Sequence, residues 1–201
     1  MENVWPVLVG ILIVGASVVA IAFAARHERE RRRIWKGLAL ARGLDFRDAT
    51  GPWYRPTAAS MEGLHEGVEV RVDTHTTGSG KQKHTWTRVT TRLPRPLAGK
   101  VVVTRRNLFS SIGKLVGMQD VEVGAREFDE QLIVQSQPEP LARSVLVDDV
   151  RAAILAFPRS LRLECEGGEV RLRWLRAERD KAVLEGGLRV VSATARACAR
   201  T

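Results

Sequence analysis

The stretch WPVLVGILIVGASVVAIAFAA, residues 5–25, contains no charged side chain, and the basic run RHERERRRIWK, residues 26–36, follows it directly. The uncharged run from Val4 to Ala25 is 22 residues long. At about 1.5 Å of rise per residue, a helix of this length covers the roughly 30 Å hydrocarbon core of a bilayer. We therefore predict a single transmembrane helix over about residues 5–25, with the rest of the chain attached to its C-terminal end.

A cleaved signal peptide is the alternative for this stretch. Such a peptide has a positively charged region before a short apolar run. Here residues 1–4, MENV, carry no basic side chain, the apolar run is long, and the basic residues follow it. These features favour an uncleaved span. The positive-inside rule then predicts that the residues from Arg26 onward lie in the cytoplasm and that the N-terminus lies outside.

The chain beyond the apolar run is long enough for one domain with its own core. We predict an anchor over 1–25, a basic juxtamembrane helical stem over 26–43, and a cytoplasmic domain over 44–201. Ile34, Leu38 and Ala41 recur at helical spacing, so stem and span are candidates for one continuous rod. The predicted fold class is α+β, with an N-terminal single transmembrane helix followed by one mainly antiparallel sheet domain with two or three packed helices.

Alternating apolar and polar residues predict the strands of this domain. The clearest case is LRLECEGGEVRLRW, residues 161–174, in which two alternating runs flank a Gly167-Gly168 turn. Strands are predicted at 44–46, 63–65, 68–72, 85–93, 100–104, 121–123, 131–135, 161–165 and 170–174. Helical spacing predicts helices over 142–157 and about 180–199, and a short helical turn within 108–116.

The basic residues identify an anionic membrane surface as a candidate partner. The formal net charge is +9, and residues 26–36 alone hold six basic and two acidic residues. Each Lys or Arg near an anionic leaflet gains about 1 kcal/mol. The loop HTTGSGKQKH, residues 75–84, adds two lysines but lacks the residues and the following helix of a phosphate-binding loop. The candidate lipid contacts are Arg29, Arg31, Arg32, Arg33, Lys36, Lys81 and Lys83. Ordinary solvated charge is the alternative interpretation.

A second predicted partner is another protein or a second copy of the chain. Ala16, Ala20 and Ala24 repeat every four residues in the apolar run. Small residues at this spacing let two helices approach closely. Nucleic acid is not an expected partner, because the basic residues are not interleaved with aromatic residues and no helix-turn-helix pattern is present.

The sequence contains no motif for catalysis or metal binding that we can identify. It lacks G-x-S-x-G, and His65, His75 and His84 lack the spacing that preorganises metal ligands. Cys165 and Cys198 are far apart and form no C-x-x-C motif. We therefore expect no catalytic residue, cofactor or metal. The two cysteines are expected to be free thiols serving as small buried side chains.

The portion from Ala125 to Leu175 resembles a segment of bacterial membrane-anchored proteins of uncharacterised function. The resemblance lies in Phe128-Asp129, in QLIV at 131–134, in Ala142-Arg143 and in the hairpin at 161–174. It implies an anchored cytoplasmic domain at a bacterial inner membrane. It transfers no catalytic residue to this chain.

Three functional hypotheses follow. The first is a single-pass membrane-anchored protein whose cytoplasmic domain acts as an interaction or scaffolding module without catalysis. The second is a module that senses or binds anionic lipid at the membrane surface. The third, from a different class, is an enzyme with a site that the sequence does not reveal.

Overall fold

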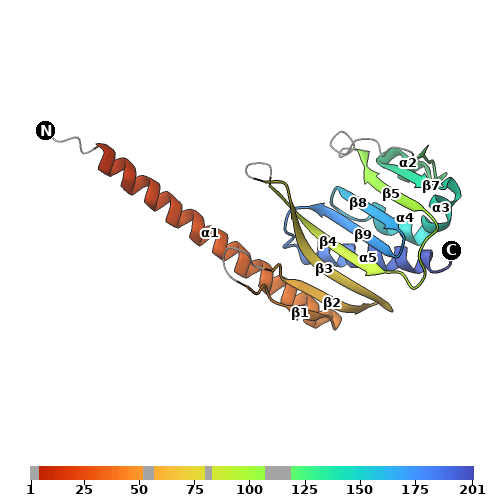
Figure 1. The fold of residues 1–201 in the computed structure, drawn as a ribbon, viewed down its shortest axis with the longest axis horizontal. Coiled ribbons are helices and arrows are strands. Elements are labelled where there is room, and N and C mark those ends of the chain that lie inside the picture. Colours follow the sequence, from red (N-terminus) through yellow and green to blue (C-terminus); the bar gives the residue numbers. More distant parts are fainter. Residues whose placement is uncertain (1–4, 52–56, 80–82, 107–118) are drawn as a thin grey trace.

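The computed structural model describes residues 5–51, 57–79, 83–106 and 119–201 (Figure 1). Within these ranges the strands are β1 (Asp45–Arg47), β2 (Ser60–His65), β3 (Val68–Thr77), β4 (His84–Arg92), β5 (Lys100–Arg105), β6 (Gln119–Asp120), β7 (Leu132–Gln137), β8 (Leu161–Glu166) and β9 (Glu169–Leu175). The helices are α1 (Trp5–Arg42), α2 (Arg126–Gln131), α3 (Glu139–Val145), α4 (Asp148–Leu155) and α5 (Lys181–Cys198). The predicted α+β class of the domain is confirmed.

All these strands form one antiparallel sheet. Their order is β1-β2-β3-β4-β9-β8-β5-β7-β6. The central strands β4, β9, β8 and β5 are brought together from distant parts of the sequence, since β4 pairs with β9 and β5 pairs with β8. The two outermost strands are short, as is common at exposed sheet edges.

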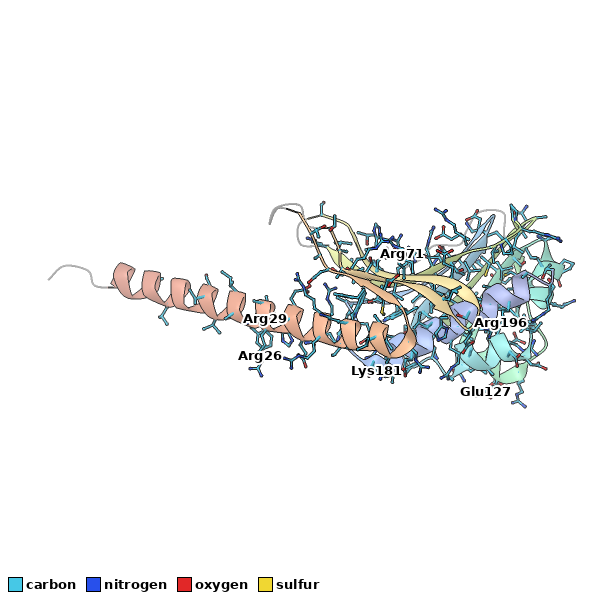
Figure 2. All side chains as sticks on the ribbon, turned by 90° about the horizontal axis from the view of Figure 1, so that it is seen from below. Arg26, Arg29, Arg71, Glu127, Lys181 and Arg196 are labelled. Carbon is cyan, nitrogen blue, oxygen red and sulfur yellow. The ribbon has the colours of Figure 1, made fainter. Side chains whose placement is uncertain are left out.

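The two faces of the sheet differ in composition because successive side chains of a strand alternate between them. On β3, Val70 and Val72 are buried while Glu69 and Arg71 are exposed. On β9, Leu172 and Trp174 are buried. The apolar face is covered by α3, α4, α5 and the end of α1. Figure 2 shows Arg71 on the side of the sheet away from α5, which we call the open face.

Helix α5 supplies the centre of the covering layer. It contacts β3, β4 and β9 as well as α3 and α4. Gly187 is buried in this helix, and a Cβ added there would come within 2.9 Å of the Trp174 indole. The glycine therefore lets α5 lie directly on the ring. This close approach explains why position 187 holds a glycine, although glycine in the interior of a helix is destabilising. The two cysteines are free and buried, as expected, on β8 and α5.

Helix α1 requires a correction to the predicted architecture. It is one helix of 38 residues, so the uncharged run and the stem are continuous, a point that the sequence left open. It does not stop where the apolar run stops, but continues through the basic run into the domain core, where Trp35, Leu38 and Ala39 are buried. Among the helices of the described ranges, none is both long enough and apolar enough to cross a membrane. The prediction of a single-pass transmembrane helix over residues 5–25 was therefore wrong.

Three smaller predictions also need correction. The helix expected over 142–157 is two helices, α3 and α4, because Val147 is extended and begins a new helix. The segment around Phe128 forms α2, which was not predicted, and Phe128 anchors it in the core. The strand expected at 121–123 is observed as β6, at 119–120. The helical turn expected within 108–116 lies outside the described residues.

A pair of glycine substitutions tests the packing of α5. Gly187→Ala is expected to destabilise the protein by about 1–2 kcal/mol, because the overpacking against Trp174 outweighs the gain in helix propensity. Gly37→Ala is the matched control within α1, where an added Cβ would meet nothing within 4 Å. We expect it to stabilise the protein by up to about 1 kcal/mol. Urea unfolding measures both, and equal effects would contradict the packing argument.

Candidate functional site: a basic stripe on helix α1

Four cations form a stripe along one side of α1. Arg26, Arg29, Arg33 and Lys36 are all exposed. Their spacing of three, four and three residues places them within roughly 80° of arc on the helix, at about 100° per residue. Within the described residues none of the four has an acidic partner at ion-pair distance. We call these four residues the basic stripe.

The other two cations of the basic run have structural partners. Arg31 is buried and donates to Glu28 at 2.7 Å, and Arg32 binds the same carboxylate at 3.1 Å. Arg32 also binds Asp48, which lies beyond α1, at 3.1 Å. Burial raises the pKa of Glu28, but hydrogen bonds and charge from the two arginines outweigh it, so the pKa lies below its usual value. Of the predicted lipid contacts, Arg31 and Arg32 therefore stabilise the helix and its junction.

The lysines of the predicted loop are placed only in part. Lys81 lies outside the described residues. Lys83 is exposed at the start of β4. The free end of the β3–β4 hairpin and the free part of α1 extend toward the same end of the molecule in both views (Figures 1 and 2). Arg26, which was not among the predicted lipid contacts, belongs to the basic stripe.

The spacing of the stripe was readable in the sequence. Positions 26, 29, 33 and 36 follow the helical repeat, whereas position 31 falls on the opposite side of the helix and position 32 lies about 40° outside the edge of the stripe. Treating the basic run as one block obscured this division. The burial of Arg31 could not be read in this way, since it depends on the domain that packs beside it.

Glu178 holds α1, and with it the stripe, against the domain. The indole Nε1 of Trp35 donates to the Glu178 backbone carbonyl at 2.9 Å. The backbone N–H of Glu178 donates to the Thr87 hydroxyl at 2.8 Å, and that hydroxyl donates to the Arg176 carbonyl at 2.7 Å. The connection between β9 and α5 is thereby tied both to α1 and to β4.

The carboxylate of Glu178 is buried and fully occupied with donors. It accepts from Trp174 Nε1 at 3.1 Å, from Arg159 Nε at 3.2 Å, and from two backbone N–H groups at the start of α5, at 2.9 and 3.0 Å. Burial raises the pKa of this carboxyl, but the hydrogen bonds from Arg159, the two backbone amides and Trp174 together bring it below the usual value. The folded state therefore favours the charged form of Glu178.

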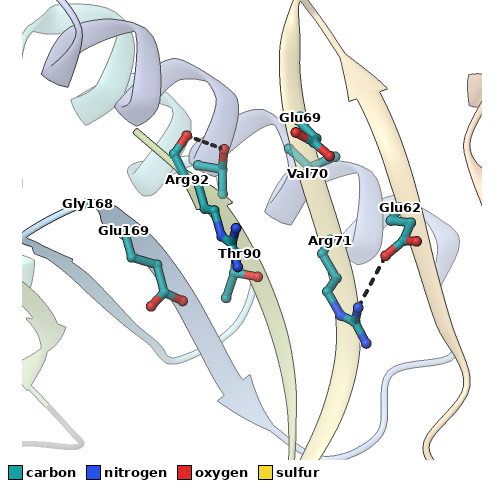
Figure 3. A pocket seen from close by; sticks show the side chains of 9 residues that line it. Glu62, Glu69, Val70, Arg71, Thr90, Arg92, Gly168 and Glu169 are labelled. Atoms are coloured by element: carbon teal, nitrogen blue, oxygen red, sulfur yellow. Dashed lines mark hydrogen bonds and ion pairs between the residues drawn. The ribbon is translucent and has the colours of Figure 1, made fainter. Parts of the chain in front are cut away.

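A hollow of about 470 Å³ lies on the open face of the sheet (Figure 3). Its polar lining comes from β2, β3, β4 and β9 and includes Glu62, Arg71, Thr90, Arg92 and Glu169. Arg71 binds Glu62 at 3.2 Å. Such paired charges suit binding of a polar group. The lining residues include no Ser, Cys or Lys nucleophile beside a general base, so the hollow gives no specific support to a covalent enzyme mechanism.

The three histidines considered as metal ligands are separated. His65 is buried and its Nδ1 lies 2.9 Å from the Ser192 hydroxyl of α5, whereas His75 and His84 are exposed on β3 and β4. Burial lowers the pKa of His65, with neighbouring Glu66 acting in the opposite direction. In the ranges that the structure describes, no three His, Cys, Asp or Glu side chains are grouped for a metal ion. Ala16, Ala20 and Ala24 are exposed along α1, and their role in self-association stays a prediction.

Replacing Glu178 tests how much its carboxylate stabilises the connection between β9 and α5, against which α1 packs. Glu178→Gln is expected to destabilise the protein by about 2–4 kcal/mol at pH 7, because donors to a buried carboxylate lose a charged acceptor. The pKa of Glu178 in the folded protein lies below its ordinary value of 4.5. The stabilisation that the charged carboxylate gives is therefore complete above pH 4.5 and is lost as the pH falls through the lowered pKa. Urea unfolding at pH 7 and pH 3 should therefore show a difference between the proteins that shrinks in acid.

Glu127→Gln provides the control for this substitution. Glu127 is exposed on α2, and its loss is expected to change stability by less than about 0.5 kcal/mol. Equal stabilities of the two variants at pH 7 would show that the Glu178 contacts do not hold the fold together.

Comparison with known proteins gives one structural relative. No family model and no curated protein sequence matches the chain. The fold is similar to the crystal structure of the mycobacterial trehalose monomycolate transport factor A, TtfA, with a TM-score of 0.58 and 14% sequence identity. The alignment covers 84% of this chain and 94% of that chain. At this identity the likeness describes the fold alone, so the chain shares its architecture with that transport factor.

Proposed function

We propose that the protein is a non-catalytic accessory factor of lipid transport that binds an anionic membrane surface through the basic stripe. The observation that carries this proposal is the set of four exposed cations on α1 without acidic partners in the described structure. Four unpaired cations on one side of a helix cost self-repulsion unless an anionic partner is present. A surface of anionic headgroups supplies such a partner without requiring a specific pocket.

The apolar part of α1 supports the same partner. Side chains of this part that are large and exposed include Leu12, Val19, Ile21 and Phe23, with Phe23 63% exposed. They adjoin the basic stripe along the helix. Amphiphilic lipids offer both an anionic headgroup for the stripe and an apolar portion for these side chains.

The fold likeness supports a role in lipid transport. The similar structure is that of a mycobacterial trehalose monomycolate transport factor, and trehalose monomycolate is a lipid. We propose a related kind of role for this chain, at the inner membrane of a bacterium. The substrate lipid and the partner proteins of such a role are not specified by the likeness, because at 14% identity only the architecture is shared.

A protein scaffold is the second candidate function. The open face of the sheet favours it, since this face presents charged side chains from β2, β3, β4 and β9 that no described helix covers. Lipid binding and scaffolding are compatible, because the stripe and the open face belong to different elements. A lack of vesicle binding would favour scaffolding over lipid binding.

Vesicle binding of the full chain tests the lipid proposal. We expect co-sedimentation with phosphatidylglycerol vesicles at low salt and weaker binding at high salt, because the attraction between exposed charges is screened. The variant R26Q/R29Q/R33Q/K36Q is expected to bind on the order of 100- to 1000-fold more weakly, at about 1 kcal/mol per cation.

The matched control removes four cations elsewhere. R95Q/R126Q/R143Q/R200Q makes the same change of net charge at exposed positions away from α1, and we expect it to retain most of the binding. Equal loss in both variants would assign the effect to net charge. Absence of binding by the unmodified chain at low salt would exclude the proposal.

A further inference from the structure

The open face carries three arginines in one row across neighbouring strands. Arg88 of β4 lies directly opposite Arg173 of β9, and Arg173 lies directly opposite Arg162 of β8. Directly opposite residues have Cβ atoms about 4.5–5.5 Å apart, and like charges in such positions destabilise a sheet. The row therefore needs compensating negative charge.

The two outer arginines of the row have their own carboxylates. Arg88 binds Asp73 through Nε at 2.8 Å and through a terminal nitrogen at 2.7 Å, which is a bidentate pair. This hydrogen bond raises the pKa of Arg88, against the effect of burial. Arg162, whose side chain is 7% exposed, binds Glu164 at 2.5 Å. Both outer guanidinium groups are thus neutralised.

The central arginine lacks an equivalent partner among the described residues. Its nearest carboxylate is that of Glu164, at 3.5 Å, which already binds Arg162 and lies 3.7 Å from Arg171. The Nε of Arg173 is buried and has no hydrogen-bond partner. Burial lowers the pKa of Arg173, and the charge of Glu164 does not offset it. A buried donor without an acceptor destabilises the folded state.

The neighbourhood of Arg173 is rigid and aromatic. Its guanidinium lies 5.7 Å from the centre of the Trp86 ring, within the range of a cation–π contact. The Trp86 indole is itself held by its hydrogen bond to the Thr77 hydroxyl at 2.9 Å. The guanidinium is therefore oriented by its surroundings while 31% of its side chain remains exposed. Trp86 orients the guanidinium group of Arg173, and the hydrogen-bonding capacity of this group is not fully used. An arginine in this state is suited to bind an anion.

We propose that Arg173, flanked by Arg88 and Arg162, binds a phosphate group on the open face of the sheet. The exposed part of the Arg173 side chain has one carboxylate within ion-pair range, Glu164 at 3.5 Å. A phosphate on the open face can therefore accept from the terminal N–H groups of Arg173, and the positive charges of Arg88 and Arg162 on either side add attraction. Lipid headgroups and free phosphorylated molecules both provide this chemistry. The nearby acids Asp73 and Glu164 limit the local positive charge, which favours a group of low charge such as a phosphodiester.

This site is distinct from the basic stripe and does not depend on the proposed lipid-surface function. The stripe lies on α1, whereas the arginine row lies on β4, β9 and β8. The stripe variant R26Q/R29Q/R33Q/K36Q is accordingly expected to bind phosphate as the unmodified chain does. Failure of one proposal therefore leaves the other open to its own test.

Nuclear magnetic resonance titration of the full chain tests the phosphate site. Inorganic phosphate or dimethyl phosphate is added at constant ionic strength, and the Trp86 indole N–H and Arg173 Nε–H signals are followed. We expect saturable changes in the chemical shifts of these signals. The affinity for phosphate should be at least tenfold weaker in Arg173→Met and unchanged in Arg126→Met, a control at an exposed position of α2. Tighter binding of dimethyl phosphate would assign the site to a headgroup diester, and tighter binding of inorganic phosphate to a free phosphate.

Stability separates a binding arginine from a structural one. Methionine keeps an unbranched side chain of similar length beside Trp86 but removes the like charge, so Arg173→Met should melt at or above the temperature of the unmodified chain in phosphate-free buffer. Phosphate should raise the melting temperatures of the unmodified chain and of Arg126→Met, but not that of Arg173→Met. A melting temperature of Arg173→Met below that of Arg126→Met, absence of saturable shifts, or equal phosphate affinity in Arg173→Met and the unmodified chain would each overturn the proposal.

Discussion

The contacts of Glu178 are the constraint on which the arrangement of the molecule depends. One residue accepts from Trp35 of α1, from Trp174 of β9 and from the amides just before α5, and it also binds Arg159. Its backbone N–H also donates to Thr87 of β4, so α1 and β4, which are distant in the sequence, meet the connection between β9 and α5 there. A buried carboxylate is stable only when its hydrogen-bonding capacity is filled, so these partners must be present together. Helix α1 is joined to the same residue through the backbone carbonyl of Glu178, which accepts from Trp35.

Around this point the molecule separates apolar packing from charge. One face of the sheet packs on α5, where Gly187 allows the helix to contact the Trp174 ring. The other face carries arginines and carboxylates arranged by strand register. Register rather than sequence neighbourhood decides which charges compensate each other, since Asp73 reaches Arg88 across β3 and β4. A surface of this kind can keep one cation poorly compensated without disturbing the core.

Patterns with a short period predicted the fold best. The alternation in residues 161–174 predicted β8 and β9, and the apolar spacing near the C-terminus predicted α5. Predictions that covered a longer stretch failed where an extended residue interrupts a helix or where tertiary packing lengthens it. The single helix expected over 142–157 divides at Val147, and the helix expected to cross a membrane continues into the domain core. Within the basic run, the helical repeat places Arg29 and Arg33 on one side of the helix and Arg31 on the opposite side.

The sequence by itself determined the local elements, the α+β class and the position of the basic stripe, because these depend on the spacing of side chains along one segment. Only the tertiary structure decided the strand order, the role of Glu178 and the row through Arg173. In each of these cases residues far apart in the chain must meet, and no short-range pattern records which partner a strand or a buried charge will find. The local run of uncharged residues likewise did not reveal that α1 continues into the core, because the burial of Trp35 and Leu38 depends on the domain that packs around them.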